Sequence, residues 1–218
     1  MRKLIIICAG LFLTIGFSTG QIVKLQIGRN WSILGDGKSS PSFDPLKGFD
    51  EPFPGYSVFI GIDYLNLKFF NLSSNLGYII KKGEQSYISL RPNGGSDLVT
   101  NKTNLGYLSI NTTIDMKYPI RNLLIPFISL GPRLDYLISN KSESRWDILK
   151  SSVFGITMGG GLKYNISKMQ IGLRFDHYLN FDKNSELRAM PSYTGFISAV
   201  PITEKTSLLS ISIAYKLK

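Results

Sequence analysis

The only histidine of the chain, His177, is the side chain best suited to act as a general base near neutral pH. A histidine base needs a nucleophile within hydrogen-bond reach, and some lipid-deacylating serine hydrolases place the two on one strand face as His-x-Ser. Here the sequence is His177-Tyr178-Leu179, with leucine at the serine position. The sequence therefore predicts no catalytic residue, and His177 is interpreted as a polar residue at a membrane interface.

Metal, thiol and phosphate-loop chemistry lack the residues that they need. One histidine cannot form a multi-histidine metal site, and Cys8, the single cysteine, lies in the apolar N-terminal segment. The glycines between Gly155 and Gly161 follow a strand pattern, whereas a phosphate-binding loop requires a turn before a helix. We expect no metal site and no bound cofactor.

Nine charged residues remain that could act together, because alternation places them on a common face of the predicted strands. They are Lys24, Asp63, Asp115, Lys117, Arg133, Asp135, Lys163, Arg174 and Asp176. The two signs nearly balance, so these side chains can pair where water is excluded. They could form a proton or ion path, a catalytic carboxylate pair, or a structural network of salt bridges. The choice depends on the elements that carry them.

The clearest of these elements is a hairpin formed by residues 151–182. One face of its first strand carries Phe154, Met158 and Leu162, while the other face mixes charges with glycines. Period-two alternation of this kind defines the two faces of a β-sheet. Both strands have the ten or so residues that a tilted strand needs to cross a bilayer.

The same alternation recurs along the chain and predicts eight strands. Their ranges are 21–33, 56–64, 70–80, 108–118, 123–139, 151–166, 169–182 and 205–217. Long and short connections alternate, and both ends of this series fall on the side of the short connections. This order predicts an all-β fold, an eight-stranded antiparallel up-and-down transmembrane β-barrel with short periplasmic turns and long extracellular loops. Such a barrel has no continuous pore, which favours the salt-bridge network for the inner charges.

The prolines of the fifth strand, Pro126 and Pro132, remove ladder donors. We therefore expect a bulge or a bend near one of them.

The outward face has to be decided against a lipocalin-like barrel, in which the apolar face points inward. Amphipathic aromatic residues prefer membrane interfaces, and the apolar face ends in tyrosine at the short-connection end of four strands. We expect one interfacial aromatic ring there, formed by Tyr64, Tyr118, Tyr164 and Tyr215. A second group near the opposite rim comprises Trp31, Tyr56, Tyr78 and Tyr136. The glycines of the other face suit a crowded interior, so the apolar face is predicted to point outward into lipid.

Residues 1–20 have the features of a cleavable signal peptide: basic Arg2 and Lys3, an apolar stretch, and small residues before Gln21. Residues 21–218 are then predicted to form one outer-membrane β-barrel domain. Without Arg2 and Lys3 the 25 lysines and arginines fall to 23 against 15 acidic residues, a net charge of +8. Phosphate-rich outer-leaflet lipid is a suitable counter-charge for an exported chain, and nucleic acid is not.

Six basic residues are predicted to lie in or beside the long external connections. They are Lys81, Lys82, Lys102, Lys141, Arg145 and Lys150. They could bind lipid phosphates or an acidic partner, or simply be solvated loop charges.

Several stretches resemble the PorT-like outer membrane β-barrel family of Bacteroidetes. They are residues 69–72 and 77–83, 127–132 and 136–138, the glycine-rich stretch 154–164, and Leu-Arg-Phe-Asp-His-Tyr at 173–178. The resemblance implies an eight-stranded barrel with no assigned activity, and one type of member serves in type IX secretion.

We therefore expect a monomeric, non-enzymatic protein of the bacterial outer membrane, exported through the general secretory pathway. Its extracellular loops would give it a structural or surface-binding role. The expected partners are outer-membrane lipid and lipopolysaccharide, together with an unknown surface ligand or secretion-machine proteins, and not nucleic acid. The alternatives are a type IX secretion-associated barrel subunit and a lipid A-modifying barrel enzyme.

Overall fold

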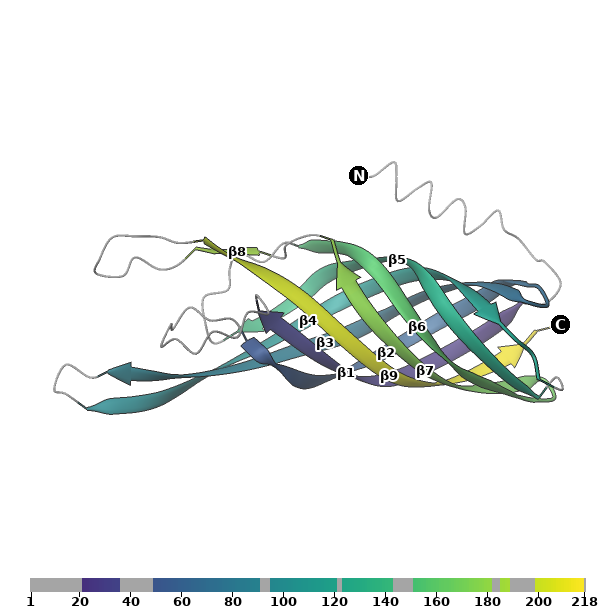
Figure 1. Ribbon diagram of the computed structural model, residues 1–218, viewed down its shortest axis with the longest axis horizontal. Helices are drawn as coiled ribbons and strands as arrows, with labels where there is room; N and C mark the ends of the chain where they lie inside the picture. The colour runs from purple at the N-terminus through teal and green to yellow at the C-terminus, as the bar shows by residue number, and fades with distance from the viewer. Residues whose placement is uncertain are drawn as a thin grey trace.

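The computed structural model describes residues 21–35, 49–90, 95–120, 123–142, 151–181, 185–188 and 199–217 (Figure 1). The predicted signal peptide, residues 1–20, lies outside this part of the chain. Within it the chain forms nine β-strands. They are β1 (Ile22–Gly35), β2 (Phe49–Asn66), β3 (Phe70–Leu90), β4 (Ser96–Lys117), β5 (Leu124–Ser142), β6 (Ser152–Ile166), β7 (Met169–Asn180), β8 (Ser185–Arg188) and β9 (Ala199–Lys216).

Eight of these strands close into a barrel. Each pairs antiparallel with its neighbour in the order β1-β2-β3-β4-β5-β6-β7-β9, and β1 pairs with β9 to complete the ring. The four-residue β8 lies outside the ring and pairs with the first part of β9. The predicted eight-stranded up-and-down barrel is confirmed, because every wall strand finds two antiparallel partners and no edge remains.

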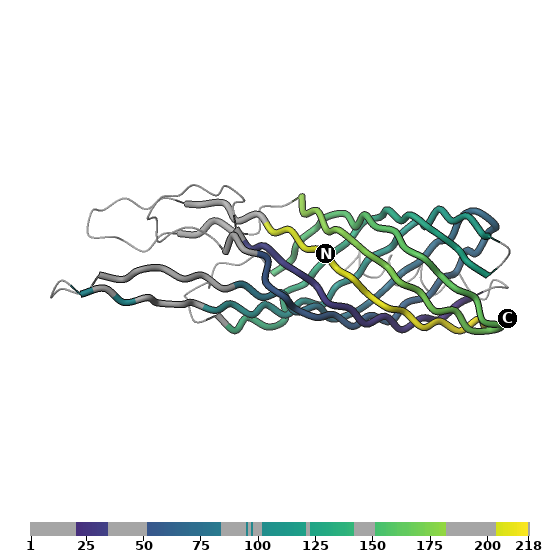
Figure 2. Tube along the Cα trace, turned by 60° about the horizontal axis from the view of Figure 1, so that its bottom comes forward, coloured from purple at the N-terminus to yellow at the C-terminus, as the bar shows by residue number. Residues whose placement is uncertain are grey.

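The strands wind steeply around the barrel axis (Figure 2). A row of paired residues that leaves β1 at Ile22 crosses all eight strands and returns to β1 at Ser32, ten residues further along. A stagger of this size goes with a strand tilt of about 40°. The barrel is therefore narrow enough for side chains to fill its interior.

Inward and outward residues alternate as the sequence predicts. On β2, Phe59 is 2% exposed and its neighbour Ile60 is 63% exposed. β7 shows the same alternation along most of its length, with Arg174 inside and Phe175 outside. The outer wall is thus largely apolar, and the charged residues of the strands lie mostly in the lumen.

The strands at the long-connection end extend further than the sequence predicts. Residues 81–104 were expected to form a loop, but β3 and β4 stay paired as far as Leu90 and Ser96. This two-stranded β-ribbon projects beyond the barrel (Figure 1). The sequence of this ribbon lacks the apolar alternation that revealed the barrel strands. The expected loops 34–55 and 183–204 likewise contain the start of β2, all of β8 and the start of β9.

The strand register shows no bulge at the two prolines of β5. Pro126 pairs with Leu162 and Pro132 with Ile156 without any change of register. On the β4 side the register is the same before and after Pro132, and the shift of register lies between Gly106 and Tyr107 instead. Each proline within β5 lacks a backbone N–H group, so each removes one donor from the ladder without changing the register.

The lumen also contains an apolar layer that the sequence analysis did not separate from the polar face. Its members are Leu34, Phe59, Ile79, Leu105, Tyr107, Val153, Tyr178 and Leu208, each at most 2% exposed. Inward residues of β4 and β7 supply its two tyrosines, which contact buried cations described below. The interior is therefore part ionic and part apolar.

Candidate functional site

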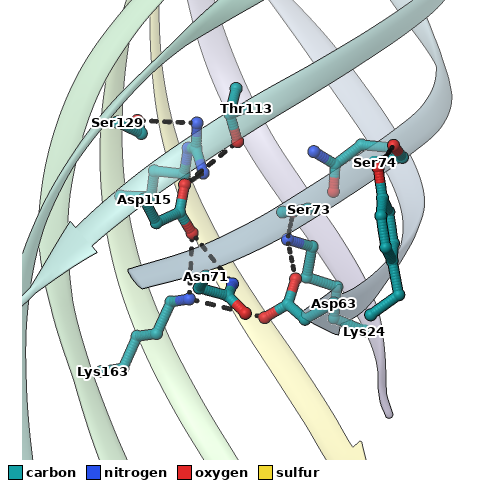
Figure 3. Close-up of polar contacts among 12 residues, drawn as sticks. Lys24, Asp63, Asn71, Ser73, Ser74, Thr113, Asp115, Ser129 and Lys163 are labelled. Atoms are coloured by element: carbon teal, nitrogen blue, oxygen red, sulfur yellow. Dashed lines mark hydrogen bonds and ion pairs between the residues drawn. The ribbon is translucent and has the colours of Figure 1, made fainter. Parts of the chain in front are cut away.

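One group of lumenal charges lies near the short connections (Figure 3). The ammonium group of Lys24 is 2.8 Å from Asp63, and Lys163 lies 3.2 Å from Asp115 and 3.6 Å from Asp63. Lys24 also donates a hydrogen bond to Ser73. These side chains come from five different strands, so the ion pairs tie opposite walls of the barrel together.

Arg174 on β7 extends the same group. Its Nε lies 2.7 Å from an oxygen of Asp176, one NH group lies 3.7 Å from Asp115, and the other donates to Ser129 Oγ at 2.9 Å. Its guanidinium also faces the ring of Phe127, 5.7 Å from the centroid. The charge is thus both paired and hydrogen-bonded, which a buried guanidinium requires.

Asp115 has the most partners in this group. In addition to Lys163 and Arg174, it accepts hydrogen bonds from Asn71 at 3.3 Å and Thr113 at 3.0 Å. A carboxylate held in this way is fixed as an acceptor. The arrangement suits a structural tie better than a proton carrier, which would need an oxygen free to exchange.

A second group of charges lies among the apolar layer, towards the long connections. Lys81 is 2.7 Å from Asp135 and also pairs with Glu204, while Arg133 lies 2.8 Å from the same oxygen of Asp135. All four side chains are at most 1% exposed. The cations also lie over aromatic rings: Lys81 is 4.3 Å from the centroid of Tyr107, and Arg133 is 4.0 Å from that of Tyr178.

Lys81 corrects a sequence-based expectation. It was assigned to an external loop as a candidate for binding lipid phosphates, but it is buried in the lumen because β3 continues through it. Glu204 was likewise placed in a loop and missed as its partner. The inward parity of β3 and β9, extended a few residues past the predicted strand ends, would have found both residues.

The structure places eight of the nine predicted lumenal charges inside the barrel. The exception is Lys117, the last residue of β4, which is half-buried at the short-connection mouth and donates to Asn66. The mouth holds a pocket of about 270 Å³ whose lining includes Lys68, Lys117, Lys163 and Lys216.

Close packing leaves little space between the lumenal groups. A Cβ atom at Gly159 would collide with the carboxylate of Asp176, and one at Gly61 would lie 2.6 Å from Lys24 Cε. At Gly159 the backbone carbonyl oxygen of Phe175 would also lie 2.5 Å from the added atom, so glycine is required there. At Gly61 a larger residue would displace the end of the Lys24 side chain. In the lumen as described, the paired charges are at most 11% exposed.

At the short-connection end, three of the four predicted ring tyrosines point outward. Tyr118 is 67% exposed, Tyr164 is 47% exposed and Tyr215 is 48% exposed. Tyr64 is half-buried, and its hydroxyl lies 3.2 Å from Ser74 Oγ on the neighbouring strand. Ser74 pairs with the outward residue Ile62, so Tyr64 lies against the outer face of the neighbouring strand.

His177 has a serine partner that the sequence analysis missed. Its Nδ1 lies 3.0 Å from Oγ of Ser207, which is directly opposite on β9. The search for His-x-Ser considered only one strand, whereas a cross-strand neighbour is equally close. Met158 flanks the pair on β6 and Trp31 flanks it on β1, and neither can orient an imidazole as the acid of a triad does.

Metal-binding and helical features are limited in the described residues. Within them, no group of three histidine, cysteine, aspartate or glutamate side chains could hold a metal ion. They also include no helix long and apolar enough to cross a membrane.

Comparison with known proteins supports the fold. No family model matches the chain, and no curated protein matches it. Among solved structures, it is similar to Neisserial surface protein A, with a TM-score of 0.50, 11% identity and coverage of 90% of this chain and 97% of that one. It is also similar to the outer membrane protein AlkL, with a TM-score of 0.50, 14% identity and coverage of 93% and 92%. At these identities, the similarity establishes the barrel fold.

Proposed function

We propose that this chain is a monomeric, non-enzymatic β-barrel of the bacterial outer membrane that presents the β3–β4 ribbon as a binding surface outside the cell. The observation that carries the proposal is the outer wall. Large apolar side chains are exposed on every barrel strand, for example Leu25, Ile114, Ile128 and Ile211. A protein dissolved in water rarely exposes apolar patches beyond a few hundred Å².

The levels of the aromatic residues support a position across a bilayer. Tyr215 at the short-connection end pairs with Val23, and Trp31 lies eight residues further along the same strand. At about 3.3 Å per residue and a tilt of about 40°, these levels are roughly 20 Å apart. This distance is close to the apolar band of about 25 Å in outer-membrane barrels.

The long connections give the proposed orientation. Outer-membrane barrels keep short turns on the periplasmic side and long loops outside. The two-residue turn between Ile166 and Met169 would then face the periplasm, and the β3–β4 ribbon would face the exterior. General secretory export remains part of this proposal, with residues 1–20 as the signal.

The ribbon is suited to binding because it projects beyond the barrel (Figure 1). β2 pairs with β3 only as far as Ile80, and β5 pairs with β4 from Thr103 onward. Between these limits the strand pairs among the described residues are those of β3 with β4, and the edge of such a projecting ribbon can accept an extended segment of another protein. We infer that the surface ligand is a polypeptide that adds a strand.

Membrane placement can be tested by electrophoresis without boiling. A closed barrel in detergent should migrate faster unheated than boiled, and the protein should fractionate with outer membranes. Recovery as a water-soluble protein with a single mobility would contradict the proposal. The binding role can be tested by comparing cells that express the intact protein with cells that express a ribbon-deleted barrel, using adhesion to protein-coated surfaces as the readout.

The PorT-like relationship belongs to this proposal as well. It rests on the glycine-rich pattern of β6 and on the Leu173 to Tyr178 segment of β7. Co-purification of large envelope proteins with the tagged barrel would favour the secretion-associated role over surface binding.

One observation favours a second candidate, a lipid A-modifying enzyme: the hydrogen bond between His177 and Ser207 on the outer wall. Two variants, Ser207→Ala and His177→Ala, test it. Under the non-enzymatic proposal, the lipid A mass profile of expressing cells is the same for both variants as for the intact protein. A modified lipid A species that disappears in both would establish the enzyme instead.

A further inference from the structure

Four outward side chains on three adjacent strands form a distinct basic patch on the apolar wall. They are Arg29 and Trp31 on β1, Tyr56 on β2 and Lys82 on β3, and we call them the basic wall patch. Arg29 and Tyr56 are exposed, and Trp31 and Lys82 are half-buried. The patch goes beyond the proposed binding role of the ribbon, since it lies on the wall below it.

The strand register brings the patch together. Arg29 pairs with Tyr56, and Trp31 pairs with Pro54. The guanidinium of Arg29 lies 5.9 Å from the centroid of Trp31, and the ammonium of Lys82 lies 5.6 Å from the centroid of Tyr56. Arg29 thus leans towards the long-connection end, while Lys82 leans onto the ring beside Arg29. Each cation thus lies over an aromatic ring, Arg29 over Trp31 on β1 and Lys82 over Tyr56 on β2.

The height of Arg29 along the outer wall indicates where its charge would lie relative to the bilayer. Arg29 lies six residues beyond Val23, which pairs with the ring residue Tyr215, so it is about 15 Å above that ring. A charged side chain is costly at the centre of a bilayer and much less so near its interface. Contact with Trp31 shows that the guanidinium is directed towards the outer interface, as a snorkelling arginine is.

The outward side chains that the structure describes on β1, β2 and β3 include no acidic residue. A membrane anion can therefore act as the counter-ion of the patch. Guanidinium and ammonium groups both bind phosphate, the former through paired hydrogen bonds. Below the patch, exposed Ile27 and Ile60 offer an apolar surface for acyl chains.

We propose that the basic wall patch binds a phosphate group of a phosphorylated glycolipid in the outer leaflet, with Arg29 and Lys82 on two sides of the phosphate. Trp31 and Tyr56 lie at the level of the headgroup, where aromatic side chains are favoured. The acyl chains of the same molecule lie along the wall towards the barrel centre.

Binding can be followed at the site itself, because Trp31 is one of only two tryptophans. In a Trp146→Phe background, the emission of Trp31 in detergent-solubilised full-length protein is titrated with bisphosphorylated lipid A in mixed micelles. The same titration is run with chemically dephosphorylated lipid A and with inorganic phosphate. We expect saturable binding of the phosphorylated lipid, and at least about tenfold weaker binding of the dephosphorylated one.

The variant Arg29→Gln/Lys82→Gln should weaken binding of the phosphorylated lipid by about tenfold or more. The control Lys68→Gln/Lys168→Gln removes two exposed lysines at the short-connection end and should bind as the parent does. Arg29→Lys keeps the charge and should retain most of the affinity. Faster migration of unheated samples verifies that each barrel is folded.

Three results would overturn the inference. They are equal affinity for both forms of lipid A, unchanged affinity in the folded Arg29→Gln/Lys82→Gln variant, and binding of inorganic phosphate as tight as that of the lipid. A water-soluble, unclosed protein would instead overturn the proposed function, so the two failures are distinguishable.

Discussion

The cations of the lumen differ in how much each is expected to contribute to the stability of the barrel. Lys81 holds two carboxylates, Asp135 and Glu204, in a site that water does not reach, while Lys117 lies at an open mouth. Removing one partner of a buried ion group leaves an uncompensated charge, which costs far more than losing a solvated pair. The burial of a cation, more than its charge, therefore predicts how much stability is lost when it is removed.

Replacing Lys81 with methionine should lower the free energy of unfolding by about 3–5 kcal/mol, since Asp135 and Glu204 would remain buried with one fewer cation. Urea titration in detergent micelles, with the fraction of fast-migrating unheated band as readout, measures this change. Lys141→Met removes an exposed lysine and should shift the midpoint little. Equal midpoints for the two variants would show that Lys81 is not part of a buried ion group.

The hydrogen bond between His177 and Ser207 should have only a modest effect on stability. A double-mutant cycle with His177→Ala and Ser207→Ala should give a coupling free energy of about 0.5–1.5 kcal/mol. The same urea titration measures it. Zero coupling would indicate that the pair does not form in the folded barrel.

Individual strands show which sequence signals are reliable. The bounds of the β6–β7 hairpin were predicted almost to the residue. Its residues point alternately to the outer wall and to the lumen, so apolar and polar or small residues alternate along most of both strands. The ribbon formed by β3 and β4 was not predicted, because its sequence lacks this alternation and has the composition of a loop. Pairing across strands was also invisible: parity placed His177 outward, but only the register brings Ser207 next to it.

The ribbon should be dispensable for folding. Replacing residues 84–102 with an Asn-Gly turn joins Gly83 to Thr103, which already pair with each other. Because the barrel pairs of β3 and β4 are untouched, we expect a fast-migrating unheated band and a thermal midpoint within a few degrees of the parent. Loss of the closed form would show that the ribbon contributes to barrel assembly.

The molecule as a whole has the reverse polarity of a water-soluble barrel: its charges are enclosed and its wall is greasy. Sequence alone predicted this inversion from aromatic residues at strand ends and glycines among the inner charges. It did not predict the apolar layer within the lumen. Phe59 and Ile79 are apolar residues at inward positions of the alternation, but alternation within one strand does not show that inward residues of different strands pack together. The alternation along a strand predicts which face of the sheet a residue occupies, but it does not predict which inward residues pack together in the lumen.

Charges introduced into the wall should be tolerated according to depth. Ile60→Lys lies midway along the wall and should destabilise the barrel in lipid vesicles by about 2–4 kcal/mol, whereas Leu217→Lys at the short-connection end should cost about 0–1 kcal/mol. Both side chains are exposed, at 63% and 50%. Unfolding titrations in vesicles of a single lipid compare them. Equal effects would mean that no hydrocarbon surrounds the wall.

Closure through β1 and β9 has a consequence for how the protein is made. The first and last strands of the described chain zip together over fourteen residue pairs, from Ile22 with Lys216 to Gly35 with Thr203. A nascent chain that lacks β9 therefore leaves the strand edges of β1 and β7 without this partner, and each exposed edge can pair with another chain and aggregate. The ring can therefore shut only after β9 has been synthesised, and a chain truncated before β9 cannot form a smaller closed barrel in the same way.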